Sequence, residues 1–187
     1  MAYNLAQKVS GNAKTVITDM ANVLSSIDTL SLCNIHATDT VTVDLYVASQ
    51  VTTDVTDTGA NVNNGSNYAA GATSVAADGS FGGTDAIRSD LFLDERVYKE
   101  DGTFIGICTA IHSTGTPLTF SAGLEVALLD DENLHTGTRY YILKSYVLPK
   151  NATLVLEKNE LRVDPQIYTM YIKLSAADSA VDLITRK

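Results

Sequence analysis

The residues of this 187-residue chain that could do chemistry begin with three histidines, His36, His112 and His135. A serine nucleophile needs a histidine base and an orienting carboxylate in direct contact. Each histidine lies at or near a predicted turn, which suits a solvated side chain as well as a catalytic one. The sequence contains neither a Gly-x-Ser-x-Gly elbow nor a His-Glu-x-x-His motif. We therefore predict no enzyme, and we assign no catalytic, cofactor-binding or metal-ligating residue and no cofactor.

Carboxylates gather in two polar stretches that could supply oxygen ligands. One is Asp130-Asp131-Glu132, and the other combines Asp54 and Asp57 with the asparagine-rich residues 61–64. Calcium takes six to eight oxygens, which such loops can provide. No EF-hand or nonapeptide spacing is present, so a structural calcium and an ordinary solvated acidic loop both stay open. No motif fixes a pair of carboxylates for glycoside hydrolysis.

Tyrosine is plentiful in the second half of the chain. Five tyrosines at strand-like spacing could stack on sugar or fill a core or an interface: Tyr140, Tyr141, Tyr146, Tyr168 and Tyr171. Three basic residues, Arg139, Lys144 and Lys150, lie in the same apolar region. They could pair with carboxylates of a neighbouring subunit, or they could be solvated edge charges that discourage strand-to-strand aggregation.

The two cysteines, Cys33 and Cys108, are too few for a disulfide framework or a four-cysteine metal site. Each lies in an apolar, strand-like run, LSLCNI or IGICTAI. Free cysteine is among the most buried residue types, so we expect inert core thiols. The sequence leaves open whether the two are bridged.

Composition excludes several classes of partner. Net charge is −9, and charged residues make up only 19% of the chain. Nucleic-acid and anionic-membrane binding depend on clustered Lys and Arg, so both are disfavoured. No run approaches the roughly 20 apolar residues that span a bilayer. The polar start of the chain lacks the pattern of a signal peptide, so we expect folding in a cytosol, with a neutral surface partly covered by other proteins.

Alternation of apolar and polar residues predicts strands. In residues 40–47 every second residue is Val or Leu, and residues 29–35 form a second strand. A polar link at 36–39 predicts that these two form a hairpin. Near the C-terminus, residues 168–174 alternate in the same way, and a short last strand covers 181–184.

Two further hairpins are predicted by their turns. Asp101-Gly102 supplies the positive φ angles of a type I′ turn between residues 96–100 and 103–107. The second strand should continue to Ile111 and turn into residues 118–120. Another hairpin should join 140–148 to 153–157 through a turn that contains proline. The strand 140–148 is apolar on both faces, which predicts a central position or an outer face covered by another chain.

Residues 51–90 break the strand pattern. They are rich in Thr, Asn, Ala, Ser, Asp and Gly and poor in large apolar side chains. We interpret them as a long irregular surface insertion or arm. One or two helical turns are predicted at 122–131 and 5–9. The whole pattern predicts an all-β fold, an antiparallel β-sandwich or jelly roll, in which residues 1–187 form a single domain.

Two stretches carry a family resemblance: LSLCNIHATDTVTVDLYV at 30–47 and RYYILKSYVLPKNATLVLEKNELRV at 139–163. They resemble small β-rich virion structural proteins of tailed bacteriophages, especially marine and cyanobacterial myophages. The likeness covers 27–46, 139–161 and, more weakly, 168–184, about two fifths of the chain. It does not cover 51–90.

The resemblance implies a non-enzymatic protein that forms homo-oligomers and binds other capsid or tail subunits in the virion, after assembly in the host cytoplasm. It transfers no catalytic residue and does not distinguish head, neck and tail. A capsid decoration role is our first hypothesis, with the arm at 51–90 clamping between neighbouring subunits. A neck, tail or baseplate component is the alternative in the same class. A carbohydrate-binding adhesion module is the alternative from another class, and a small-molecule ligand is not expected.

Overall fold

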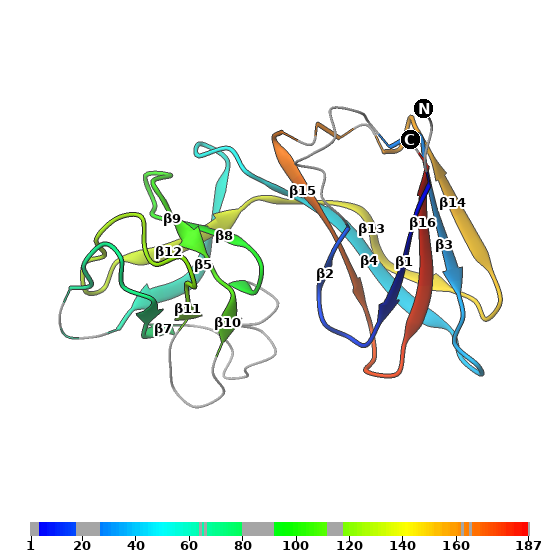
Figure 1. The fold of residues 1–187 in the computed structure, drawn as a ribbon, viewed down its shortest axis with the longest axis horizontal. Coiled ribbons are helices and arrows are strands. Elements are labelled where there is room, and N and C mark those ends of the chain that lie inside the picture. Colours follow the sequence, from blue (N-terminus) through cyan, green and yellow to red (C-terminus); the bar gives the residue numbers. More distant parts are fainter. Residues whose placement is uncertain are drawn as a thin grey trace. The chain divides into compact units, whose positions relative to one another are not determined.

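The computed structural model divides the chain into two compact units (Figure 1), one formed by Met1–Ala48 with Arg139–Lys187 and the other by Ser49–Thr138. It describes residues 4–17, 27–63, 65, 67–79, 92–111, 118–161, 163–164 and 166–186, which form sixteen strands. The prediction of an all-β fold is confirmed. The prediction of a single domain over 1–187 needs correction, because each unit has its own core cluster. Among the described residues, no helix has the length and apolar character needed to cross a membrane.

Unit 1 is a sandwich of two four-stranded sheets. Sheet A has the order β1 (Asn4–Ser10), β16 (Ala180–Arg186), β3 (Thr29–Asn34) and β14 (Thr153–Glu157). Sheet B has the order β13 (Arg139–Leu148), β4 (Val41–Ser49), β15 (Tyr168–Leu174) and β2 (Thr15–Val16).

Alternation builds the core between these sheets. On β4, Val41, Val43 and Leu45 are buried in one apolar cluster together with Leu30 and Leu32 of β3. Successive strand side chains point to opposite faces, so one face of each sheet supplies this cluster. The half-buried strands expected at 40–47, 168–174 and 181–184 are therefore confirmed.

The strands of unit 1 pair in a nested order. The first strand pairs with the last, β2 with β15, β3 with β14, and β4 with β13, each time antiparallel. Successive pairs alternate between the two sheets. The chain is thus one long two-stranded ribbon rolled into two layers, which is the arrangement of a jelly roll.

Two predicted hairpins are wrong for the same reason. Strands β3 and β4 lie in different sheets, as do β13 and β14. The polar links after β3 and β13 carry the chain from one sheet to the other. A link of this kind has the same turn residues as a hairpin loop, so the sequence signal cannot separate the two.

Asn34 joins both layers at one of these links. Its buried side-chain amide donates to the carbonyl oxygens of Asp39 and Leu148, each at 3.0 Å. Its carbonyl accepts the backbone N–H of His36 at 2.9 Å. Both N–H groups and the carbonyl oxygen of the amide are therefore hydrogen-bonded, and they tie the end of β3 to the loop before β4 and to the end of β13.

Unit 2 has one sheet of five strands and one of three. The larger has the order β7 (Ala77–Gly79), β5 (Val55–Val62), β12 (Asn133–Gly137), β8 (Arg96–Tyr98) and β9 (Phe104–Ile107). The smaller has the order β10 (Ala110–Ile111), β11 (Leu118–Thr119) and β6 (Ser74–Val75).

The prediction of an irregular arm at 51–90 needs correction where the structure describes it. Three strands, β5, β6 and β7, fall within this range, and Ala60, Val62 and Val75 are fully buried in the core of unit 2. These small side chains join a core whose larger members come from later in the chain, such as Ile105, Phe120 and Leu134, so the apolar content of 51–90 alone did not reveal it. Residues 80–91 lie outside the described residues.

The hairpin at Asp101-Gly102 is confirmed, with a different turn. Strands β8 and β9 pair antiparallel, and only Gly102 of the dipeptide has a positive φ, at 81°. Gly102 donates to the carbonyl of Lys99, and Lys99 donates to Thr103. This is a three-residue loop closed by a glycine bulge rather than a type I′ turn. A Cβ at Gly102 would also lie 1.7 Å from the carbonyl oxygen of Thr52.

Both helical predictions are wrong. Residues 5–9 belong to strand β1, and residues 122–131 form turns and an isolated bridge. Strand β9 ends at Ile107 and β10 belongs to the other sheet, so the expected continuous strand to Ile111 is also interrupted. The turn expected at 113–117 lies outside the described residues.

Unit 2 lies in the chain between the two strands of the innermost pair. Its first residue, Ser49, donates a backbone hydrogen bond of 2.9 Å to Thr138, its last. Thr138 in turn donates to Asp54 at 3.0 Å. The two ends of the insertion are therefore adjacent and bonded.

We predict that the sandwich folds without the insertion. Replacing residues 50–137 by Asn-Gly would join the bonded pair Ser49 and Thr138 through a two-residue hairpin turn. The shortened protein should give one cooperative unfolding transition and the β-type circular dichroism of a sandwich. Deleting only 51–90 should instead unfold unit 2, because it removes β5 from the interior of the five-stranded sheet. Retention of unit 2 amide protection in that deletion would contradict this.

We also predict that Asn34→Ala destabilises the protein by about 2–4 kcal/mol, because two carbonyls lose their donor and one of them is buried. Urea unfolding followed by near-ultraviolet circular dichroism measures the loss. The matched control is Asn12→Ala at an exposed position, which should change stability by less than about 0.5 kcal/mol. Equal effects of the two changes would refute a bridging role for Asn34.

Candidate functional site

The outer face of sheet B carries a row of tyrosine rings. Tyr141 of β13 lies directly opposite Tyr46 of β4, and their ring centroids are 5.4 Å apart. Tyr46 stacks on Tyr171 of β15 at the same distance. The row thus crosses three neighbouring strands. Tyr46 and Tyr171 are buried, whereas Tyr141 remains 43% exposed.

A cation lies over each ring of this row. The guanidinium of Arg139 is 5.0 Å from the Tyr46 centroid, the Lys144 ammonium 4.9 Å from Tyr141, and the Lys14 ammonium 5.0 Å from Tyr171. Such contacts are worth about 0.5–2 kcal/mol each, more where they are desolvated. Two of the three basic residues singled out from the sequence therefore hold tyrosines in place, while Lys150 lies at the exposed turn after β13.

Strand β13 is an edge strand, so of the two predicted alternatives the central position is wrong, and an outer face covered by another chain stays a prediction. Its apolar character on both faces leaves four large side chains open to solvent: Tyr140 at 47%, Tyr141 at 43%, Tyr146 at 38% and Val147 at 54%. By their register with β4, Tyr141 and Val147 lie on the outer face of sheet B, and Tyr140 and Tyr146 lie on the core side at its open edge. We call these four, which together border the edge strand, the β13 surface. Tyr140 also makes an edge-to-face contact with Tyr168.

The free edge of β13 is irregular. Its register with β4 shifts twice, between Tyr141 and Leu143 and between Leu143 and Tyr146. Ser145 has a φ of 51°, and its backbone N–H donates to the Asp44 carboxylate at 2.6 Å. Bulges of this kind disfavour the addition of another strand. A partner would therefore contact the β13 surface through side chains rather than through a backbone ladder.

The histidines do not form a catalytic group within the described residues. The imidazole of His36, in unit 1, accepts the backbone N–H of Asp39 at 2.9 Å and lies 3.5 Å from the Asp178 carboxylate. His135, in unit 2, is a buried residue of β12. His112 lies outside the described residues.

Carboxylates of the two acidic stretches accept backbone hydrogen bonds or form an ion pair within unit 2. Asp130 accepts the backbone N–H of Gly65 at 3.1 Å, and Asp57 accepts that of Gly59 at 2.8 Å. Glu132 pairs with Lys99 at 2.9 Å. Across the part of the chain that the structure describes, no three His, Cys, Asp or Glu side chains gather as a metal site would require.

The cysteines are free thiols in different units. Cys108 is fully buried in the core of unit 2, as expected. Cys33 is only partly buried, so it is not a core thiol.

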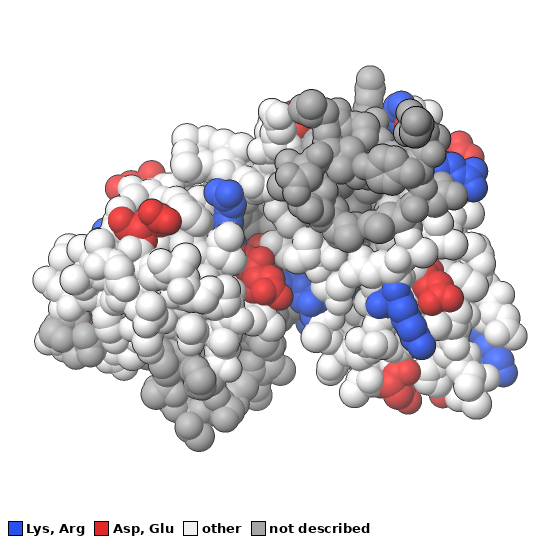
Figure 2. Space-filling view, viewed as in Figure 1, with Lys and Arg blue, Asp and Glu red and all other residues white. Residues whose placement is uncertain are grey.

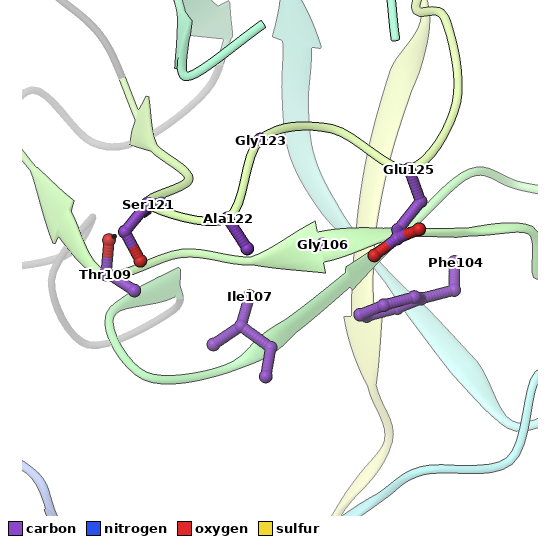
Figure 3. A pocket seen from close by; sticks show the side chains of 8 residues that line it. All are labelled: Phe104, Gly106, Ile107, Thr109, Ser121, Ala122, Gly123 and Glu125. Carbon is purple, nitrogen blue, oxygen red and sulfur yellow. Dashed lines mark hydrogen bonds between the residues drawn. The ribbon is translucent and has the colours of Figure 1, made fainter. Parts of the chain in front are cut away.

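Unit 2 contains a small open pocket beside strand β9, with a volume of about 230 Å³. Phe104, Ile107 and Ala122 form its apolar walls, and Glu125 lies at one end (Figure 3). The segment 121–125, which overlaps the helical turn expected at 122–131, forms one wall because the backbone N–H of Glu125 donates to the carbonyl oxygen of Ile105 at 2.9 Å. Gly123 of this segment passes close to Gly71: its φ is 80°, and a Cβ there would lie 2.9 Å from the Gly71 carbonyl oxygen. No sequence signal singled out this pocket.

Charge is dispersed over the visible surface. In Figure 2, most of the described surface is uncharged, and acidic and basic side chains lie interspersed on it. Large single-sign patches, which attract nucleic acid or membranes, are not seen on this face of the described residues.

Comparison of the chain with protein-family models, with curated proteins and with solved structures gives no match.

Burial raises the pKa of Tyr98 on β8, and this effect outweighs the nearby Arg96 guanidinium, which lowers it. The folded state therefore keeps the Tyr98 proton at a pH where the unfolded chain, with an ordinary tyrosine pKa of 10.0, has lost it. Stability must fall as the pH rises above that value.

We predict that Tyr98→Phe reduces this alkaline loss of stability. Free energies of unfolding from urea titrations between pH 8 and pH 11 should fall less steeply for the variant, by up to about 1.4 kcal/mol per pH unit. The wild-type chain contains nine tyrosines, so the difference between the two proteins isolates Tyr98. Parallel pH profiles would show that this hydroxyl does not couple ionisation to folding.

Proposed function

We propose that this chain is a non-enzymatic structural protein of a bacteriophage particle, a decoration or cement-like subunit that acts through protein–protein contacts. The observation that carries the proposal is the β13 surface, where four large apolar side chains are exposed on one edge strand. Exposed apolar surface of this kind typically marks an interaction site. Aromatic residues with an adjacent arginine are also typical of interface centres.

Two further observations support the proposal. The jelly-roll strand order is found in viral capsid and lectin domains, although fold alone does not establish function. The stretches that resemble phage virion proteins, 30–47 and 139–163, cover most of β4 and all of β13, the pair that carries the surface.

The tyrosine geometry favours a protein partner over a sugar. Sugar stacking needs an open ring face. Lys144 lies over the ring of Tyr141, and Tyr140 packs edge-to-face on Tyr168. Glycan-array binding that is lost in Tyr140→Ala and Tyr141→Ala variants would favour the adhesion module instead.

The clamping role first given to residues 51–90 does not fit strands that belong to the sheets of unit 2. The described residues between 51 and 79 include strands β5, β6 and β7 of unit 2 and are not an irregular arm, so we place the assembly contact on the β13 surface. The location of the chain in the particle separates the two alternatives: a decoration protein lies on the head, and the alternative lies in the neck, tail or baseplate. Particles purified from an infected culture that produces the chain should contain it at a fixed copy number. Its presence in lysate and absence from particles would remove the virion proposal.

We predict that Val147→Asp weakens self-association and particle loading at least about tenfold, because association would bury an unpaired carboxylate. Sedimentation velocity measures the first effect, and quantitation of bound protein on purified particles measures the second. The matched control is Val155→Asp, which puts the same charge at a similarly exposed valine on β14, an edge strand of sheet A. If only the control lost self-association and particle loading, a contact through β13 would be contradicted.

A further inference from the structure

The pocket beside β9 combines an apolar lining with a single charged group. Phe104, Ile107 and Ala122 line it, Glu125 supplies its one carboxylate, and Thr109 and Ser121 lie at the opposite end (Figure 3). Its volume of about 230 Å³ is below the range of roughly 300–1,000 Å³ that is typical of drug-sized ligands. The pocket is therefore of a size for one long side chain.

The polar groups of the pocket differ in whether they already have a hydrogen-bond or ion-pair partner. The Thr109 hydroxyl donates to the carbonyl of Thr119 at 3.2 Å and accepts the backbone N–H of Ser121 at 3.3 Å. The Glu125 carboxylate has no ion-pair partner among the residues that the structure describes, although it lies beside apolar walls. Charge complementarity at this pocket therefore calls for a cation.

We propose that this pocket receives a lysine side chain from a partner protein. The four-carbon stem would cover Phe104, Ile107 and Ala122, and the ammonium would reach Glu125 at the open end. Lysine commonly buries its stem along apolar surface while its charged head stays in water. The site lies wholly in unit 2, so the proposal goes beyond the assembly contact on β13 and stands without it.

The donor count selects lysine over arginine. A guanidinium carries five N–H donors in a fixed plane; the one carboxylate can accept two of them, and the apolar walls accept none of the other three. An ammonium is compact and can leave its other donors in solvent at the open end of the pocket. A neutral side chain of the same length would fill the apolar part and leave Glu125 unpaired.

The test is a nuclear magnetic resonance titration of the full-length protein with three probes: the N-acetyl methylamides of lysine, arginine and norleucine. We expect the lysine probe to shift the backbone amides of Gly106, Gly123 and Glu125, with a dissociation constant on the order of 1–10 mM. Norleucine should bind about two- to five-fold more weakly, the range of one exposed ion pair.

Glu125→Lys should abolish the shifts, because the introduced ammonium repels the probe. Glu100→Lys is the matched control: it makes the same charge change at an exposed position of unit 2 and should bind like the wild type. Unchanged amide positions elsewhere in both spectra show that the variants fold. The proposal is overturned if no probe shifts these amides, if norleucine or arginine binds as tightly as lysine, or if binding survives in Glu125→Lys.

Discussion

The antiparallel pairing of β4 with β13 is the constraint on which the rest of unit 1 depends. It is the innermost of four nested pairs, and the pairs β3–β14, β2–β15 and β1–β16 follow outward from it along the chain. The outermost ladder joins Asn4 to Arg186, almost the whole length of the sequence. The entropic cost of closing such long loops is smaller when the inner pairs form first. Insertion of unit 2 within the innermost pair lengthens that first loop, but the hydrogen bond between Ser49 and Thr138 brings its ends together once unit 2 has folded.

The same nesting explains why β13 exposes apolar side chains. A strand with apolar residues on both faces fits the interior of a sheet, where both faces are covered. As the outer member of the innermost pair, β13 instead lies at the edge of sheet B, with β4 on its inner side. Its bulges and the left-handed Ser145 protect the backbone edge, while the side chains remain accessible. The strand is thus built against indiscriminate strand pairing but remains open to a shape-specific contact.

The sequence predicted the fold class and most strands of unit 1, because alternation over five to nine residues is a direct record of a half-buried sheet. It failed on connectivity. The links at 36–39 and 149–152 have hairpin-like composition, yet they join opposite sheets, and only long-range pairing decides between the two. It also failed in unit 2 between residues 51 and 79, where the strands contribute mainly small side chains such as Ala60, Val75 and Ala77 to the core and show no clear apolar period. Of the surface features, the sequence pointed to Arg139, Lys144 and the tyrosines, but Glu125 and its pocket arise from a turn segment whose composition resembles a helix.

The chain has a net charge of −9, but its two candidate contact sites carry charges of opposite sign. Three of its thirteen lysines and arginines, Lys14, Arg139 and Lys144, lie over tyrosine rings on one face of sheet B. In unit 2, by contrast, the one charged group of the β9 pocket is a carboxylate. A partner of the β13 surface would meet aromatic rings with positive charge, and a partner of the pocket would meet an apolar wall with negative charge. Because the two sites differ in sign, one uniform surface cannot satisfy both, and the acidic excess by itself selects neither partner.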